Sequence, residues 1–302
     1  MPHEIPYQSL DYSKIKKTLG WKPKENIKST AEKIFKWYNK KNMKVVILCG
    51  GEGVRLKNHL SYMPKGLAHI DDKPLIWHIM KRYSLFGYNE FVLALGKDGH
   101  KIRNYFLNYN SYTNDIEFSL GKSNSLKYHN LNQEENWKIT LVNTGEKAHT
   151  GARVSRCQKY VDTENFMVSY SDCLSDVDID KLLKLHMKEK KIATVTGVQP
   201  PFRYGEFVIK KNKAVDFFPI SKLLAMHGHV NGGYMVFNKK IFDYLNSYNE
   251  CTLESEVFKA LTKKEELNVY KHDKFWQCLD NDREYEYLKK LCENNQRYWL
   301  VK

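Results

Sequence analysis

The sequence has 302 residues, of which 42% are hydrophobic and 28% are charged, and its formal net charge is +14. A folded chain of this length buries a large core without help from disulfides or metals. No apolar run reaches membrane-spanning length, and the first residues lack the apolar centre of a signal peptide, so we expect a cytoplasmic protein with no membrane partner.

The positive charge does not by itself indicate a nucleic-acid partner. Lysines alternate with acids, as in residues 181–191, which is typical of a solvated surface, and we predict no nucleic-acid binding. The six cysteines form no CxxC pair, and no histidine lies at a spacing that suggests zinc. Reduced thiols are therefore expected.

Residues 1–42 form a first predicted unit, a short helical appendage. A helix ends at Gly20, and a second begins near Ser29, whose hydroxyl is expected to cap it in a capping box with Glu32. Two amphipathic helices this short are not stable alone, so we expect their apolar stripe to dock on another surface.

Residues 43–302 form the second predicted unit, in which strands and helices alternate. A helix begins at Pro74 and is closed by Gly87. The other expected elements are strands at 45–49, 91–95, 139–142, 166–170 and 192–198, a helix at 178–189, and a hairpin of 206–210 with 214–218. This order predicts an α/β fold with a Rossmann-like, doubly wound, mixed and mostly parallel sheet.

A glycine loop follows the first predicted strand, in the run VVILCGGEGVRL. Gly50, Gly51 and Gly53 allow the backbone to approach phosphates closely, although a tight structural turn has the same composition. The loop matches neither the dinucleotide pattern GxGxxG nor the Walker P-loop. Arg55 and Lys65 follow it, and they favour a phosphate site because a leaving pyrophosphate needs positive charge nearby.

Two aspartates end apolar stretches. Asp172 follows the strand at 166–170, at the edge where open α/β sheets bind ligands, and Asp280 ends the run FWQCLD. Two such carboxylates suit one Mg²⁺ that bridges a triphosphate, although each is equally compatible with a helix cap or a turn. Asp176, Asp178 and Asp180 are better explained as charges at a helix start.

Several separated motifs resemble the sugar-1-phosphate nucleotidyltransferases, which have a GT-A-like fold, and within them the glucose-1-phosphate cytidylyltransferases. They are KPLIWHIMKRYS (73–84), ITLVNTGE (139–146), TGARVSR (150–156), SDVDI (175–179), ATVTGVQPPFRYGE (193–206), VNGGY (230–234) and FWQCLD (275–280). Residues 1–42 resemble the C-terminal tail of extended short-chain dehydrogenase/reductase sugar epimerases, through LGWKPK at 19–24 and the pair Trp37-Tyr38.

The resemblance implies transfer of a nucleotide from CTP or another nucleoside triphosphate to a sugar 1-phosphate such as glucose 1-phosphate, with release of pyrophosphate. It also implies Mg²⁺ as cofactor, a homo-oligomer, and a role in activating sugars for surface polysaccharides. The implied catalytic residues are Arg55 and Lys65, and the metal ligands are Asp172 and Asp280. The implied nucleotide-binding residues are Leu48, Gly50, Gly51, Glu52, Gly53, Val54, Arg153 and Ser171, and the sugar-binding residues are Tyr204, Gly205, Asn231, Gly232 and Lys222.

The chain departs from the family pattern at several positions. Val54 and Ala148 replace hydroxylated residues, Met63-Pro64-Lys65-Gly66 replaces KPKP, Ser171-Asp172-Cys173 replaces GDG, and EKP is absent from 216–221, where Lys222 is the nearest lysine. Three interpretations therefore stay open: a cytidylyltransferase acting on glucose 1-phosphate, a nucleotidyltransferase with another phosphorylated acceptor or base, and a non-catalytic binding or assembly subunit. Retention of Arg55, Lys65, Asp172 and Asp280 argues against the last.

Overall fold

The computed structural model describes residues 13–20, 22, 26–31, 43–50, 63–121, 125–129, 136–200, 206–210, 213–218 and 228–302. The chain divides into two compact units, residues 1–40 and residues 41–302, which we describe separately.

The first unit contains helix α1 (Ser13–Leu19) and a short helical stretch at 27–31. The predicted end of the first helix is confirmed, because Gly20 has a φ of 64° and its N–H donates to the Lys16 carbonyl at 3.0 Å. The expectation that Ser29 caps the second helix is wrong. Asn26 is the N-cap residue, since its Oδ1 accepts the Ser29 N–H at 2.8 Å. The Ser29 hydroxyl oxygen in turn accepts the Asn26 N–H at 3.1 Å. Glu32 lies outside the described residues.

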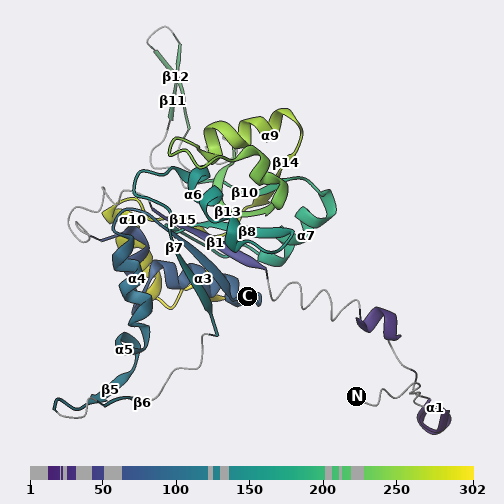
Figure 1. The fold of residues 1–302 in the computed structure, drawn as a ribbon. Helices are drawn as coiled ribbons and strands as arrows, with labels where there is room; N and C mark the ends of the chain where they lie inside the picture. Colours follow the sequence, from purple (N-terminus) through teal and green to yellow (C-terminus); the bar gives the residue numbers. More distant parts are fainter. Residues whose placement is uncertain are drawn as a thin grey trace. The chain divides into compact units, whose positions relative to one another are not determined.

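A seven-stranded mixed sheet forms the centre of the second unit (Figure 1). In order across the sheet, the strands are β14 (Leu267–His272), β10 (Ala193–Val198), β13 (Val230–Asn238), β8 (Asn165–Tyr170), β1 (Lys44–Cys49), β4 (Glu90–Leu95) and β7 (Lys138–Asn143). Strand β13 is antiparallel to both of its neighbours, and the other pairs are parallel. The predicted mixed, mostly parallel sheet is confirmed.

Strand β1 shows why its sequence is a continuous apolar run. Val45 and Ile47 belong to one buried core cluster, whereas Val46 and Leu48 belong to another. Because successive side chains of a strand point to opposite faces, β1 contributes to a core on each side of the sheet. The strand is therefore buried on both faces and places its last residues, Leu48 and Cys49, at the carboxyl edge.

Different helices cover the two faces (Figure 1). Helices α3 (Leu75–Ser84), α7 (Ile179–Glu189) and α10 (Asp282–Glu293) contribute buried side chains to the first core. Helices α6 (Thr150–Arg156) and α9 (Lys259–Lys263), with the π-helical turn η4 (Leu253–Phe258), contribute to the second. The remaining helical segments are η1 (Lys65–Leu67), α4 (Gly99–Leu107), α5 (Tyr109–Thr113), η2 (Gln158–Tyr160), η3 (Lys239–Tyr244) and η5 (Tyr298–Leu300).

Among the described residues of the second unit there are also four two-stranded ribbons. They are β2 (His69–Ile70) with β3 (Lys73–Pro74), β5 (Asp115–Phe118) with β6 (Leu126–His129), β9 (Cys173–Ser175) with β15 (Trp276–Cys278), and β11 (Glu206–Lys210) with β12 (Lys213–Phe218). The last pair is the predicted hairpin. The predicted helix start near Asp178 is also confirmed, since the Asp178 carboxylate accepts the Lys181 N–H at 2.9 Å.

Candidate active site

A cavity of about 650 Å³ opens at the carboxyl ends of β1 and β8. Ligands of open α/β sheets bind at this edge, and the volume suits a small-molecule ligand. The lining comes from the ends of β1 and β8, the turn around η1, helix α4, helix α6 with the segment that precedes it, and the start of η4. The lining residues are Leu48, Cys49, Gly50, Pro64, Lys65, Gly66, Ile102, Glu146, Lys147, Ala148, His149, Thr150, Arg153, Tyr170, Ser171, Asp172 and Glu254.

The structure brings together Lys65 and the two aspartates predicted to bind metal. The Lys65 Nζ lies 2.5 Å from Asp280 Oδ1 and 3.4 Å from Asp172 Oδ2. Burial alone lowers the pKa of Lys65, but the negative charge of Asp172 and the hydrogen bond to Asp280 outweigh burial and raise that pKa above its ordinary value. The cavity wall therefore carries a fixed positive charge between two carboxylates.

One ribbon positions both carboxylates. Asp172 lies between β8 and β9, Asp280 follows β15, and β9 pairs antiparallel with β15. The Leu279 N–H donates to the Asp172 carbonyl at 2.8 Å, and the Asp280 N–H donates to the Glu284 carboxylate at 2.6 Å. The backbone N–H or carbonyl of each aspartate takes part in these contacts, so the fold fixes the main chain at both positions and leaves both carboxylates available to Lys65.

The two carboxylates have a chemistry that suits a divalent cation. They converge on one position, since a single ammonium contacts both of them. Carboxylate oxygens are the ligands that Mg²⁺ prefers, usually one or two at a time together with substrate phosphates. Asp172 and Asp280 therefore fit the metal that the sequence implies.

The Arg153 guanidinium packs directly against the backbone of Gly50 and Gly96, where a larger residue would leave no space for it. A Cβ on Gly50 or Gly96 would lie 2.0 Å or 2.4 Å from the guanidinium. This group donates to Thr144 Oγ1 at 2.8 Å and to three backbone carbonyls, those of Gly145, Gly50 and Glu146, at 3.0, 3.1 and 3.2 Å. Arg153 thus ties the segment after β1 to the segment after β7, and burial lowers its pKa.

Leu48, Gly50 and Ser171, which the sequence predicts as nucleotide-binding, all line the cavity. Leu48 lies near the end of strand β1, Gly50 follows that strand, and Ser171 follows β8. Their backbones meet at one edge because β1 and β8 pair in parallel. Cys49 lies between Leu48 and Gly50 in the chain and also lines the cavity, and burial raises the pKa of its thiol far above the ordinary value.

A polar network that the sequence did not predict crosses one side of the cavity. The Tyr170 hydroxyl donates to the Glu254 carboxylate and accepts from Asn231 Nδ2 at 3.2 Å. The Thr150 hydroxyl donates to the same carboxylate at 3.1 Å. Tyr170 could have been found from the sequence, because it directly precedes the predicted site residues Ser171 and Asp172. Glu254 is far from them in sequence, and only the fold brings it to Tyr170. The network connects the predicted sugar-binding Asn231 to the cavity wall.

Gly232, the second described residue of the predicted sugar pocket, lies in a crowded position. The Trp276 indole N–H donates to its carbonyl at 2.8 Å, and a Cβ on Gly232 would lie 2.7 Å from Val198. This contact joins β13 to β15, the strand that precedes Asp280. The remaining predicted site residues, Gly51, Glu52, Gly53, Val54, Arg55, Tyr204, Gly205 and Lys222, lie outside the described residues.

This arrangement of a mixed sheet, a cavity at its carboxyl edge and a lysine between two aspartates is accompanied by clear similarity to known proteins. The family described as nucleotidyl transferase matches residues 44–299, so the chain belongs to the nucleotidyl transferase family. The chain is 36% identical over 259 residues to the probable glucose-1-phosphate cytidylyltransferase of Bacillus subtilis, covering 86% of this chain and 100% of that protein. It is 35% identical over 258 residues to the glucose-1-phosphate cytidylyltransferase of Salmonella typhimurium, covering 85% and 98%.

Solved structures confirm the fold. A putative glucose-1-phosphate thymidylyltransferase from Bacillus anthracis matches with a TM-score of 0.59 at 18% identity, covering 84% of this chain and 95% of that chain. A UDP-glucose pyrophosphorylase matches with a TM-score of 0.59 at 14% identity, covering 84% and 99%. Within the described part of the chain, no helix has the length and apolar content needed to cross a membrane.

Proposed function

We propose that residues 43–302 transfer a cytidylyl group from CTP to glucose 1-phosphate and release pyrophosphate. The observation that carries this proposal is the Lys65 ammonium beside Asp172 and Asp280, at the wall of a cavity on the carboxyl edge of the sheet. The names of the Bacillus subtilis and Salmonella typhimurium relatives support CTP as the nucleotide and glucose 1-phosphate as the acceptor.

In the proposed reaction, an oxygen of the sugar phosphate attacks the α-phosphorus of CTP in line with the leaving pyrophosphate. The attacking phosphate is already ionised, so this step needs no general base and no covalent enzyme intermediate. Catalysis then consists of positioning the two substrates and offsetting negative charge. Lys65 supplies a cation that the fold has already placed at the cavity wall. Mg²⁺ held by Asp172 and Asp280 would neutralise triphosphate charge when bound.

Other residues take supporting roles in this proposal. Leu48, Ser171 and the glycine loop would hold the base and triphosphate, Arg55 would face the pyrophosphate, and Tyr204, Gly205, Asn231, Gly232 and Lys222 would line the sugar pocket. We assign Arg153 to the nucleotide site through the backbone carbonyls that it fixes, because four acceptors already surround its guanidinium.

The decisive experiment measures pyrophosphate release with Mg²⁺, each common nucleoside triphosphate and a panel of sugar 1-phosphates. We expect turnover with CTP and glucose 1-phosphate. Lys65→Met should reduce it by about 10²–10³-fold, the typical cost of removing one preorganised charge-stabilising group. Lys147→Met is the matched control, because it removes a lysine from the same cavity wall but leaves the contacts of Lys65 with Asp172 and Asp280 in place. It should reduce turnover much less than Lys65→Met.

The outcomes separate the three interpretations left open by the sequence. Turnover with a different base or phosphorylated acceptor would replace the proposed substrates while keeping the reaction class. Absence of turnover with every pair, with Lys65→Met indistinguishable from the parent protein, would overturn the enzymatic proposal and leave a binding or assembly subunit.

For residues 1–42 we propose an origin in an epimerase tail and a role in docking onto a partner or in homo-oligomer formation, in a cytoplasmic protein. The resemblance through LGWKPK and the exposed apolar side chains Leu19 and Ile27 support this proposal. The competing interpretation is a fused remnant without a partner, and the two are separated by truncation.

A further inference from the structure

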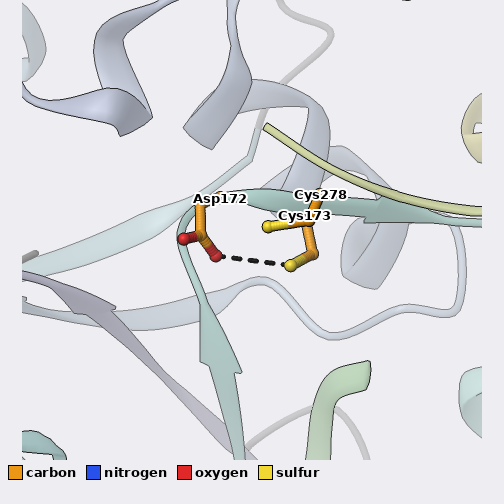
Figure 2. A group of neighbouring side chains, drawn as sticks. All are labelled: Asp172, Cys173 and Cys278. Atoms are coloured by element: carbon orange, nitrogen blue, oxygen red, sulfur yellow. Dashed lines mark hydrogen bonds between the residues drawn. The ribbon is translucent and has the colours of Figure 1, made fainter. Parts of the chain in front are cut away.

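Two cysteines and one aspartate form a compact cluster beside the candidate active site. The thiols of Cys173 and Cys278 and the carboxylate of Asp172 lie with their ligand atoms all within 4.8 Å of one another. The Cys173 thiol lies 3.3 Å from Asp172 Oδ1. Figure 2 shows both sulfur atoms and the carboxylate directed toward a shared space. Cys173 is buried, whereas Asp172 and Cys278 are half-buried, which leaves a route from solvent.

The backbone holds this cluster in place. Cys173 and Cys278 are directly opposite each other in the antiparallel β9–β15 ribbon. The Leu279 N–H donates to the Asp172 carbonyl and continues the pairing by one residue on each strand. Residues opposite each other in such a pair have neighbouring side chains, so the fold itself brings the two thiols together. The Asp172 carboxylate joins the cluster through its contact with the Cys173 thiol.

The geometry points to a site for a thiophilic divalent cation such as Zn²⁺, formed by Cys173, Cys278 and Asp172. In a tetrahedral zinc site the bonds measure about 2.0–2.3 Å, so ligand atoms lie roughly 3.3–3.8 Å apart, a separation that these side chains reach with small rotations. Two sulfurs and one oxygen favour Zn²⁺, Cd²⁺ or Co²⁺ over Mg²⁺. Binding releases the two thiol protons to solvent, and water fills the fourth position.

Occupancy of this site has a consequence for the proposed function. Asp172 is also a proposed Mg²⁺ ligand and a partner of Lys65, so one carboxylate is shared between two cation sites. A thiophilic cation would therefore inhibit nucleotidyl transfer by competing with Mg²⁺ for Asp172. The cation site itself does not depend on the proposed function, because binding can be measured without substrate.

The test titrates the reduced full-length protein with Co²⁺, whose thiolate complexes show charge-transfer absorption. We expect one equivalent of Co²⁺ to produce this absorption and one equivalent of Zn²⁺ to abolish it. Cys278→Ser should weaken binding by at least about tenfold, and the double variant Cys173→Ser/Cys278→Ser should lose the absorption. Cys292→Ser, which removes a thiol outside the cluster, is the matched control and should bind as the parent does.

Circular dichroism of each variant without metal separates loss of ligands from loss of fold. No charge-transfer absorption in the folded parent protein, or unchanged absorption in the folded double variant, would overturn the cation site. Missing pyrophosphate release with normal Co²⁺ binding would instead count against the proposed function alone.

Discussion

Replacing Arg153 by lysine separates two roles for this side chain at the cavity. A lysine keeps the positive charge, but its single nitrogen cannot reach the acceptors that the planar guanidinium connects. If Arg153 acts by fixing the segments that follow β1 and β7, Arg153→Lys should destabilise the protein. If instead it acts by direct contact with a nucleotide phosphate, the free energy of unfolding should change little.

The expected magnitude follows from the four hydrogen bonds. The bond to Thr144 Oγ1 is buried, and hydrogen bonds to charged groups contribute about 1.5–3 kcal/mol. The three carbonyl acceptors are part-buried, so water replaces part of what each one loses. We therefore expect the free energy of unfolding to fall by about 3 kcal/mol, equivalent to roughly 6–12 °C in melting temperature for a domain of this size.

Urea denaturation of the ligand-free protein measures this change, with CTP-dependent kinetics recorded in parallel. Gly96→Ala is an independent perturbation, because its Cβ would lie 2.4 Å from the guanidinium nitrogens. Gly228→Ala is its control, since no atom lies within 4 Å of that Cβ. Combining Gly96→Ala with Arg153→Lys should cost less than the sum of the two, because both disrupt the same contacts. An Arg153→Lys protein of unchanged stability but a raised KM for CTP would refute the reasoning.

Three further predictions follow from other parts of the molecule. Lys65→Met removes the ammonium that contacts both Asp172 and Asp280, so Mg²⁺ should raise the melting temperature of the variant more than that of the parent protein. Equal increases would contradict the idea that Lys65 and Mg²⁺ share one position. Burial lowers the pKa of His186 to about 4 from an ordinary 6.5, so the unfolded chain takes up a proton that the fold excludes, and stability should fall as pH drops from about 6.5 to 4. His186→Gln should remove about 3 kcal/mol of this pH dependence in urea titrations. Deleting residues 1–42 should change oligomeric state more than turnover, and unchanged light scattering would count against their proposed docking role.

The sequence predicts five of the seven strands of the central sheet, and the clearest of them are buried along most of their length, such as β1 and β4. Strands β13 and β14 were not predicted; β14 is partly exposed and its sequence is not a continuous apolar run. A short continuous apolar run between two turns, such as 45–49 or 91–95, is typical of a strand buried in a parallel sheet. Each of these two observed strands begins one residue before the predicted start. The short ribbon strands escape prediction because two or three residues carry no periodicity. Strand β9 is such a case, since Cys173–Ser175 pairs only with a distant segment.

The candidate site was predictable where its residues follow strands, as Asp172 and Asp280 do, or lie in a motif of the resembled family, as Lys65 does. Lys65, Asp172 and Asp280 have recognisable positions in sequence, and the fold brings them into contact. Glu254 had no signal, because its contact with Tyr170 depends on how η4 packs beside α6. The cap of the second helix went to Asn26 and not to Ser29, since both side chains can accept a backbone N–H and the sequence alone does not rank them.

The ribbon that carries the two aspartates also sets the order in which the site can be completed during folding. All seven strands of the sheet precede β15 in chain order, and in the described part of the chain none of them pairs with the β9–β15 ribbon. Strand β9, which follows Asp172, cannot pair until the segment Trp276–Cys278 has come into place beside it. Such long-range pairing forms late in folding. The sheet can therefore form independently of this ribbon, and the two aspartates come together at Lys65 only when β15 has paired with β9.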